Sequence, residues 1–263
     1  MSVETTRQGA AALKKGLHVF DLIADAEKPP RFVDLVAQSG LPKSTLHRLL
    51  QTLMDHGLVQ LNQETHTYSV GLRTLDVARR FWEGMDLRQI AAAEIAHLAE
   101  VTGETVHLGV RDGTEVVYID KVDSQESIRM FSRIGRRGPL HCTGVGKVLL
   151  AFADRAECEA LIPQLPMTHF TPNTFTDPRL FRRELQEIRA RGYAYDLEEH
   201  ELGVRCLSAP VFDHRRRVAA SISVTAPIFR MDMDRLAALA PVVVETAHRI
   251  TRAMGGAPPE AGA

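Results

Sequence analysis

Leu41-Pro42-Lys43-Ser44-Thr45-Leu46-His47-Arg48-Leu49-Leu50-Gln51-Thr52-Leu53 carries two interleaved stripes at helical spacing. Four leucines, beginning with Leu46, recur at i, i+3, i+4 and i+7, which is the apolar face of an amphipathic helix. The opposite face holds hydrogen-bond donors and one fixed cation but no acid, on Ser44, His47, Arg48 and Gln51. Such a strip fits the major groove of DNA, although an ordinary surface helix also shows a polar face. The elements before and after this stretch decide between the two interpretations.

Two further helices are predicted ahead of it, over Leu13–Ala26 and Phe32–Gln38. Pro29-Pro30 ends the first, because proline cannot continue a helix, and Gly40 ends the second, because glycine tolerates a left-handed cap. A short helix, a tight glycine-containing turn and a second helix with a polar strip match the helix-turn-helix pattern. The first helix is expected to bury an apolar side made of Leu17, Phe20, Leu22 and Ile23.

Beyond Gly57 the apolar period changes from helical to extended. Leu58–Leu61 and Thr67–Val70 flank a polar turn and predict a two-stranded hairpin, the wing of a winged helix-turn-helix. Three helices followed by a hairpin favour DNA binding by residues 10–71. The predicted DNA contacts are Lys43, Ser44, Thr45, His47, Arg48 and Gln51.

The composition is that of a globular protein with no basic bias. Of its 263 residues 44% are apolar and 25% are charged, and the net charge is -1, so DNA contact must come from a local arrangement of charge. Three cysteines without a C-x-x-C pair argue against a disulfide framework and a zinc ribbon. The chain shows no signal-peptide pattern and no apolar run of the roughly 20 residues that a membrane span needs. We therefore expect a cytoplasmic protein without a cofactor or a metal.

Residues 72–84 are predicted to form a linker helix that carries Phe81 and Trp82. These aromatic side chains suit pairing with a second subunit, and packing on their own domain is equally consistent with the pattern. Dimerisation would have a geometric purpose, because one recognition helix reads few base pairs whereas two read two half-sites.

Residues 85–254 are predicted to form an α+β domain with a central sheet. Thr105–Arg111 alternates apolar and polar side chains as a half-buried strand does, and Asp112-Gly113 is a hairpin turn before Val116–Val122. A third strand is predicted over Ser127–Arg133 and a loop over residues 135–139. Further helices are expected over residues 87–99, 157–162, 178–191 and 234–254, and strands over residues 203–212 and 218–225. Leu140–Ala151 is predicted to be a loop that runs into a helix. Residues 255–263 are predicted to be a disordered tail.

Gly144-Val145-Gly146-Lys147 is similar to a phosphate-binding loop but does not complete its pattern. His141 stands where the first glycine belongs, and Val148 stands where a hydroxyl would bind Mg²⁺. A dinucleotide fingerprint fails as well, because Leu149 replaces its third glycine. Two interpretations remain: N–H groups that hold an anion such as a carboxylate, or a plain helix-entry turn.

The acidic run Tyr195–Glu201 and the thiol of Cys206 raise the question of catalysis. Neighbouring carboxylates do not face each other on a helix or strand, so a solvated or capping run is favoured. Cys206 lies in a strand-like run, where cysteine behaves as a small buried hydrophobe. As a nucleophile it would need a base, for which the candidates are His107, His141 and His200. A metal site of His107, His141 and a cysteine is a weaker alternative.

Over nearly its whole length the chain resembles the IclR family of bacterial transcriptional regulators. The most specific match is Gly192–Cys206, which is close to the signature of that family's sensor domain, and Leu140–Ala151 and Lys43–Leu53 match two further blocks. The resemblance implies a winged helix-turn-helix, a linker helix and a GAF-like effector-binding domain with a central antiparallel sheet. It also implies a homodimer or a dimer of dimers, and a pocket for small carboxylic acids.

Carried over residue by residue, the resemblance places this pocket at Met130, Gly144, Val145, Asp196, Val204, Cys206, Ser223 and Thr225. Backbone N–H groups around Gly144 and Val145 would take the carboxylate. Hydroxyl or keto oxygens would bond to the three polar side chains of the set, and Met130 and Val204 would supply apolar walls. Arg129 is a lesser candidate for a counter-ion, because a neighbour of Met130 on a strand points the other way.

Lys121–Ser124 and Arg129–Arg137 look most like the family's repressors of 2-keto-3-deoxygluconate and pectin catabolism, although His141-Cys142 stands where those have Tyr-Ser. The expected function is DNA-binding transcriptional regulation, as a repressor controlled by a sugar or keto acid, and not catalysis. Two alternatives stay open: an enzyme that processes a small acid with Cys206 as nucleophile, and a metabolite-binding module that does not regulate.

Overall fold

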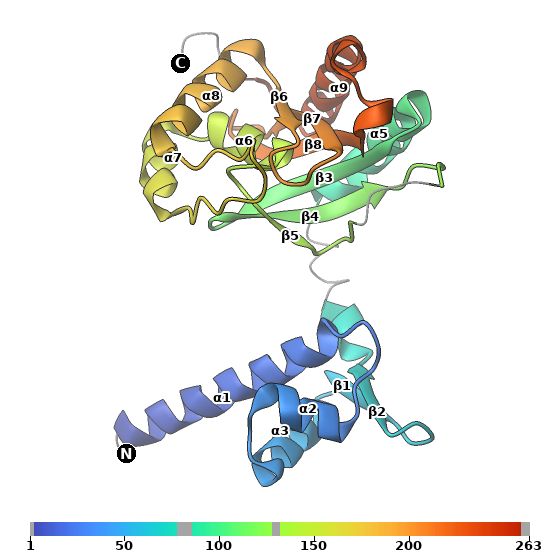
Figure 1. Cartoon of the computed structure of the whole chain (residues 1–263), viewed down its shortest axis with the longest axis vertical. Helices are drawn as coiled ribbons and strands as arrows, with labels where there is room; N and C mark the ends of the chain where they lie inside the picture. The colour runs from blue at the N-terminus through green and yellow to red at the C-terminus, as the bar shows by residue number, and fades with distance from the viewer. Residues whose placement is uncertain (1–2, 78–85, 128–131, 259–263) are drawn as a thin grey trace. The chain divides into compact units, whose positions relative to one another are not determined.

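The computed structural model describes residues 3–77, 86–127 and 132–258, and the chain divides into two compact units, Met1–Gly84 and Met85–Ala263 (Figure 1). The N-terminal unit begins with three helices and one hairpin in the predicted order. Its elements are α1 (Val3–Ala24), α2 (Phe32–Ser39), α3 (Lys43–Asp55), β1 (Val59–Asn62) and β2 (Thr67–Val70). This unit is a helix-turn-helix followed by a two-stranded wing.

One apolar core joins the elements of this unit. Leu46 and Leu50 of α3 are fully buried in it, together with Leu35 of α2 and Val19 of α1. Gly40 has φ 64°, and this left-handed conformation ends α2 and starts the turn to α3. The leucine stripe that the sequence predicts for α3 is therefore the face that packs inward.

α1 differs from its prediction in length and in its buried side. It begins at Val3 rather than at Leu13, and Leu17, predicted to face inward, is 51% exposed. The buried stripe runs through Val19 and Ile23, which lie four residues apart. Because a helix turns about 100° per residue, Leu17 lies off this stripe.

The helix that follows the wing begins at residue 73 and is described as far as residue 77. Leu72 and Leu75 are exposed there. The rest of the predicted linker helix, including Phe81 and Trp82, lies outside the described residues.

The C-terminal unit is built on a six-stranded antiparallel sheet with the order β5-β4-β3-β8-β7-β6. Its strands are β3 (Thr105–Asp112), β4 (Glu115–Val122), β5 (Arg137–Pro139), β6 (Ala194–Leu197), β7 (Val204–Phe212) and β8 (Val218–Pro227). At the centre of the sheet, His107 of β3 pairs in register with Ser223 of β8. Residues that are more than a hundred positions apart in the chain therefore become neighbours.

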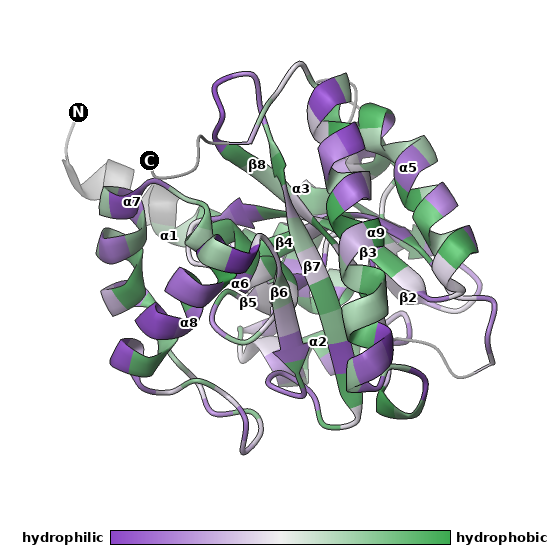
Figure 2. Cartoon of the chain, turned by 90° about the horizontal axis from the view of Figure 1, so that it is seen from above, coloured by the Kyte–Doolittle hydropathy of each residue, from purple (hydrophilic) through white to green (hydrophobic). Residues whose placement is uncertain are grey.

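Helices cover both faces of this sheet (Figure 2). One face carries α5 (Asp86–Thr102) and α9 (Met233–Ala253), and the other carries α6 (Gly144–Ala151), α7 (Arg155–Leu161) and α8 (Pro178–Arg191). Two 3-10 turns, η1 (Ile162–Gln164) and η2 (Ile228–Arg230), complete the unit. None of the described helices has the length and apolar character needed to cross a membrane.

Strand β3 is buried on both faces, whereas its alternating pattern predicted a half-buried strand. Val106 and Leu108 pack into the core under α5 and α9. Gly109 lies against Val145 of α6, and His107, two residues away, points to the same side of the sheet. The polar face of β3 is therefore covered by α6, and its side chains line an interior space.

Three segments depart from the predicted sheet. Arg137–Pro139, predicted as part of a loop, forms β5 against β4. Of the predicted strand Ser127–Arg133, residues 128–131 lie outside the described residues and the other three are not in a strand. β6 at the edge of the sheet comes from the acidic run that was predicted to be solvated.

Candidate functional site

The polar strip of α3 lies on the face opposite its buried leucines. Thr45 is half-buried, and the other five predicted DNA contacts are exposed: Lys43, Ser44, His47, Arg48 and Gln51. The described part of the chain therefore leaves most of this strip open to a ligand.

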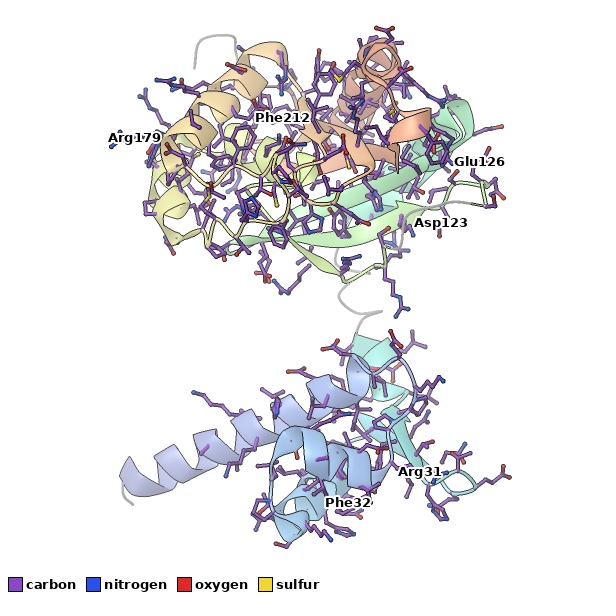
Figure 3. The ribbon with its side chains drawn as sticks, in the orientation of Figure 1. Arg31, Phe32, Asp123, Glu126, Arg179 and Phe212 are labelled. Carbon is purple, nitrogen blue, oxygen red and sulfur yellow. The ribbon has the colours of Figure 1, made fainter. Side chains whose placement is uncertain are left out.

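Two contacts restrain this strip. Gln51 Nε2 donates to Asp55 Oδ1 at 2.8 Å. The ring of Phe32, which is labelled in Figure 3, has its centroid 6.3 Å from that of His47. Asp55 follows the quoted stretch by two residues, so an acid does stand beside the strip. The Gln51 amide would have to exchange this partner for a base edge on binding DNA.

A pocket opens on the α6 side of the central strands. Seven of the eight residues that the sequence placed in the effector pocket line it, and they come from α6, β6, β7 and β8: Gly144, Val145, Asp196, Val204, Cys206, Ser223 and Thr225. The eighth, Met130, and the lesser candidate Arg129 lie outside the described residues. The fold thus brings together residues that the sequence spreads over eighty positions.

Helix α6 presents its first backbone N–H groups to this pocket. Thr143 caps the helix, and its hydroxyl oxygen accepts the N–H of Gly146 at 3.1 Å. No hydrogen bond among the described residues uses the N–H of Gly144 or Val145, as is usual in the first turn of a helix. Free N–H groups and the positive end of the helix dipole suit an anion such as a carboxylate.

His107 and Thr225 form a polar wall opposite α6. The His107 Nε2 atom lies 2.6 Å from Ser132 Oγ, and Nδ1 lies 3.4 Å from both Ser223 Oγ and Thr225 Oγ1. The Thr225 hydroxyl donates to Cys206 Sγ at 3.2 Å. This direction favours the tautomer in which Nδ1 of His107 carries the proton and Nε2 accepts from Ser132. Burial, assisted by Lys121, lowers the pKa of His107 to about 3 and keeps the ring neutral.

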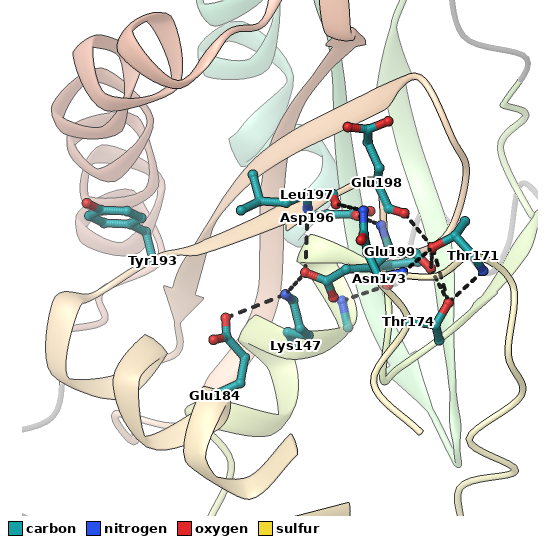
Figure 4. Close-up of polar contacts among 12 residues, drawn as sticks. Lys147, Thr171, Asn173, Thr174, Glu184, Tyr193, Asp196, Leu197, Glu198 and Glu199 are labelled. Atoms are coloured by element: carbon teal, nitrogen blue, oxygen red, sulfur yellow. Dashed lines mark hydrogen bonds and ion pairs between the residues drawn. The ribbon is translucent and has the colours of Figure 1, made fainter. Parts of the chain in front are cut away.

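Asp196 and Glu199 of the acidic run are buried beside Lys147, which corrects their interpretation as part of a solvated or capping segment (Figure 4). Glu198 is half-buried and Glu201 is exposed. Glu198 has φ 65°, and this left-handed turn returns the N–H of Glu199 to Asp196 Oδ1 at 2.8 Å. The Glu199 carboxylate pairs with Lys147, which is 0% exposed. Burial, reinforced by the charge of Glu199, raises the pKa of Asp196.

The environment of Cys206 argues against a nucleophilic role. Burial raises its pKa well above the usual range, and the neighbouring Asp196 carboxylate adds to this effect. The thiolate is the reactive form of cysteine, so a thiol held protonated is a poor nucleophile. Among the candidate bases, His107 is linked to Cys206 through the Thr225 hydroxyl, and Nε2 of His141 is bonded to the Thr168 carbonyl.

No group of three or more His, Cys, Asp or Glu side chains within residues 3–77, 86–127 and 132–258 is arranged to hold a metal. The combination of His107 and His141 with a cysteine, weighed from the sequence, is therefore not assembled in this part of the chain.

Sequence reasoning missed several residues that line the pocket: His107, Tyr118, Ser132, Arg136 and His200. For His107 a signal was present, because it lies on the polar face of a predicted strand in step with Thr105. Recognising that face as an interior wall required knowing that α6 covers it.

Comparison with known families identifies both units. The model described as the bacterial transcriptional regulator IclR C-terminal domain matches residues 80–252, and that of the IclR helix-turn-helix domain matches residues 12–63.

Individual relatives agree with this result. The Escherichia coli regulator XynR is 36% identical over 244 residues, which cover 93% of this chain and 97% of that protein. The Escherichia coli regulator KdgR is 37% identical over 229 residues, which cover 87% of each. The crystal structure of Thermotoga maritima IclR matches 94% of this chain and 99% of its own, with a TM-score of 0.80 and 32% identity. This chain therefore belongs to the IclR family of DNA-binding transcriptional regulators.

Proposed function

We propose that the protein is a repressor whose affinity for its operator is controlled by a small carboxylic acid, a sugar acid or a keto acid. The N-terminal unit would bind the operator through Lys43, Ser44, Thr45, His47, Arg48 and Gln51. The C-terminal unit would bind the acid in the pocket beside α6. Relatives that match nearly the full chain include a repressor, the Escherichia coli IclR protein, at 34% identity.

The observation that carries this proposal is the pairing of two kinds of group in one pocket. The unused N–H groups of Gly144 and Val145 suit a carboxylate. Asp196, Ser223 and Thr225 surround the same space and suit keto or hydroxyl oxygens. A pocket that contains both an anion site and oxygen partners fits a substituted acid better than an apolar ligand.

The proposed regulation needs two DNA-binding units acting together. One helix-turn-helix reads one half-site, so we propose a homodimer or a dimer of dimers in which residues 72–84 link the operator unit to the effector unit. An effector that binds one arrangement of these units more tightly than another shifts the protein toward that arrangement. The free energy by which the effector changes operator affinity then equals the free energy by which the operator changes effector affinity.

The proposal is tested by a thermal-shift screen of the full chain against sugar acids, keto acids and aromatic acids, followed by operator binding with the acids that stabilise it. A ligand of the folded state raises the melting temperature by mass action. The expected result is stabilisation by sugar or keto acids and a change in operator affinity. Stabilisation by aromatic acids alone would contradict the proposed effector class. An acid that binds a protein without affinity for its own promoter region would indicate a metabolite-binding module instead.

A further inference from the structure

Asp196 is the carboxylate inside the proposed pocket, and it lies almost completely away from water. Its side chain is 4% exposed, and Oδ1 accepts the backbone N–H of Glu199 at 2.8 Å. On the neighbouring strand β7, Cys206 is its partner in register. A negative charge in this position loses its hydration and must be compensated by the protein.

The buried cation beside this acid is already committed to other carboxylates. Lys147 Nζ pairs with Glu199, and Glu184 Oε1 lies 3.5 Å from the same nitrogen (Figure 4). Arg191 binds Glu184 from the other side at 2.9 Å. Two carboxylates, Glu199 and Glu184, thus share these two cations, and Asp196 is a third carboxyl group that is bonded to backbone instead. Even Glu199 Oε2 is buried without a hydrogen-bond partner among the described residues, so negative charge is in excess here.

The remaining ionisable groups near Asp196 are the pocket residues His107, Tyr118, Arg136, Arg137, His200, Glu201 and Cys206, and the buried thiol of Cys142. Burial lowers the pKa of each histidine and raises the pKa of the phenol and of both thiols, so these groups are uncharged. Glu201 adds negative charge. Arg137 is exposed and is held by Asp112 and Glu115. Arg136 lowers the pKa values of the two pocket histidines and of Tyr118, but it is exposed, where water and salt screen its charge.

We propose that the effector binds to a neutral Asp196, which donates a hydrogen bond to an effector oxygen, so that the pocket takes up a proton with the anion and prefers keto acids to amino acids. This inference rests on the proposed effector pocket. Lys147 and the backbone N–H groups of Glu199 and His200 favour the ionised form of Asp196, and burial outweighs them. Since Oδ1 accepts from Glu199, the proposed proton lies on Oδ2. An ionised Asp196 would instead pair with a ligand ammonium group and would make an amino-acid site.

Two effects hold the proton on Asp196 when the acid is bound. Burial and the charge of Glu199 already raise the pKa of Asp196. A carboxylate at the N-terminus of α6 brings a further negative charge into the same enclosed space, and like charges at short range raise it again. Glu199 is therefore a positioning residue: its charge keeps Lys147 occupied and keeps Asp196 neutral.

The test uses isothermal calorimetry on the full chain with two matched sets of ligands: pyruvate, lactate and alanine, and 2-ketogluconate, gluconate and glucosaminate. Titrations at pH 8 in buffers of different ionisation enthalpy give the number of protons taken up. We expect close to one proton per bound keto acid at pH 8 and close to none at pH 5.5. Within a set, the keto acid should bind at least tenfold more tightly than the amino acid, with the hydroxy acid between them.

Two variants separate the contribution of Asp196 to proton uptake from that of Glu199. Asp196→Asn cannot ionise, so its proton uptake should vanish and its affinity should not depend on pH between 6 and 8. Glu199→Gln frees Lys147 to stabilise an ionised Asp196, so proton uptake should also be lost and the keto preference should fall. Binding of keto acids to the wild type without proton uptake, or tighter binding of the amino acids, would overturn the inference while leaving an effector pocket. Failure of every acid to bind would overturn the proposed function and this inference with it.

Discussion

Gly144 on α6 and Ser208 on β7 approach so closely that a Cβ atom at position 144 would lie 2.5 Å from Ser208 Oγ. That hydroxyl oxygen is buried and has no hydrogen-bond partner among the described residues. The approach brings the first N–H groups of α6 to the strands that carry Cys206 and Ser223. Glycine is therefore required here by space, since no positive φ is recorded at position 144.

Gly144→Ala is expected to destabilise the fold by about 1–2 kcal/mol, because α6 or the Ser208 side chain must shift. Ser208→Ala removes a buried hydroxyl without a partner, so alone it should be neutral or slightly stabilising. The double variant should recover most of the loss. Urea unfolding of the four proteins measures this coupling, and strictly additive effects would rule out Ser208 as the cause.

Arg48→Ala is expected to weaken operator binding about 10- to 100-fold, because an exposed arginine of a recognition helix contacts bases or phosphates. The operator would be a site selected by the wild-type protein from random DNA, and binding would be measured by fluorescence anisotropy. Arg179→Ala is the matched control, since Arg179 is an exposed arginine that projects from α8 (Figure 3). Equal operator affinity of the two variants would place the recognition surface elsewhere.

Much of the fold was predictable because its signals are local. The leucine stripe of α3, the glycine at position 40 and the hairpin turn at Asp112-Gly113 all act within a few residues. What failed depended on distant contacts. β5 and β6 are short edge strands without a pattern of their own, and they exist because β4 and β7 offer them hydrogen bonds.

The resemblance to the family predicted the pocket residues better than residue types and spacing did. Asp196 and Glu199 belong to a run whose composition is that of a solvated loop, and their burial depends on Lys147, about fifty residues earlier. Likewise, His107 joins the pocket only because β3 pairs with β8. An ion pair between distant segments leaves no periodic pattern in the sequence. This part of the prediction therefore came from the resemblance to the family.

Asp196→Asn is expected to change how stability depends on pH. Burial raises the pKa of Asp196 from its ordinary value of 3.8 to about 7. Between these values the folded wild type holds a proton that the unfolded chain has lost, so this group lowers stability as the pH rises from 4 to 7, by at most about 1.4 kcal/mol per pH unit. In the Asp196→Asn variant this pH-dependent loss of stability is absent. The difference in unfolding free energy between variant and wild type should therefore increase across this window and level off above it; a constant difference would mean that Asp196 ionises normally.

Cys206→Ser is expected to bind the operator with an affinity within about twofold of the wild type, because the thiol is protonated and serves as a hydrogen-bond acceptor for Thr225. Alkylation of the wild type with iodoacetamide at pH 8 should be slow at this position, as mass spectrometry of the labelled peptides would show. Rapid alkylation, or turnover of a small acid that the serine variant loses, would favour the enzyme alternative.

Lys147→Met is expected to be the most damaging single change considered, with a loss of about 3–5 kcal/mol in unfolding free energy. Removing this buried cation leaves Glu199 without its ion pair and deprives Glu184 of one of two cations. The Lys147 side chain is fully buried, and its Nζ also lies 5.2 Å from the centroid of the Phe175 ring. Adding Glu199→Met should therefore restore part of the loss, because a buried pair replaced by apolar side chains of similar size is often close to neutral. Urea unfolding of both variants distinguishes the outcomes: a double variant no more stable than Lys147→Met would mean that packing by the lysine chain, rather than uncompensated charge, accounts for the loss.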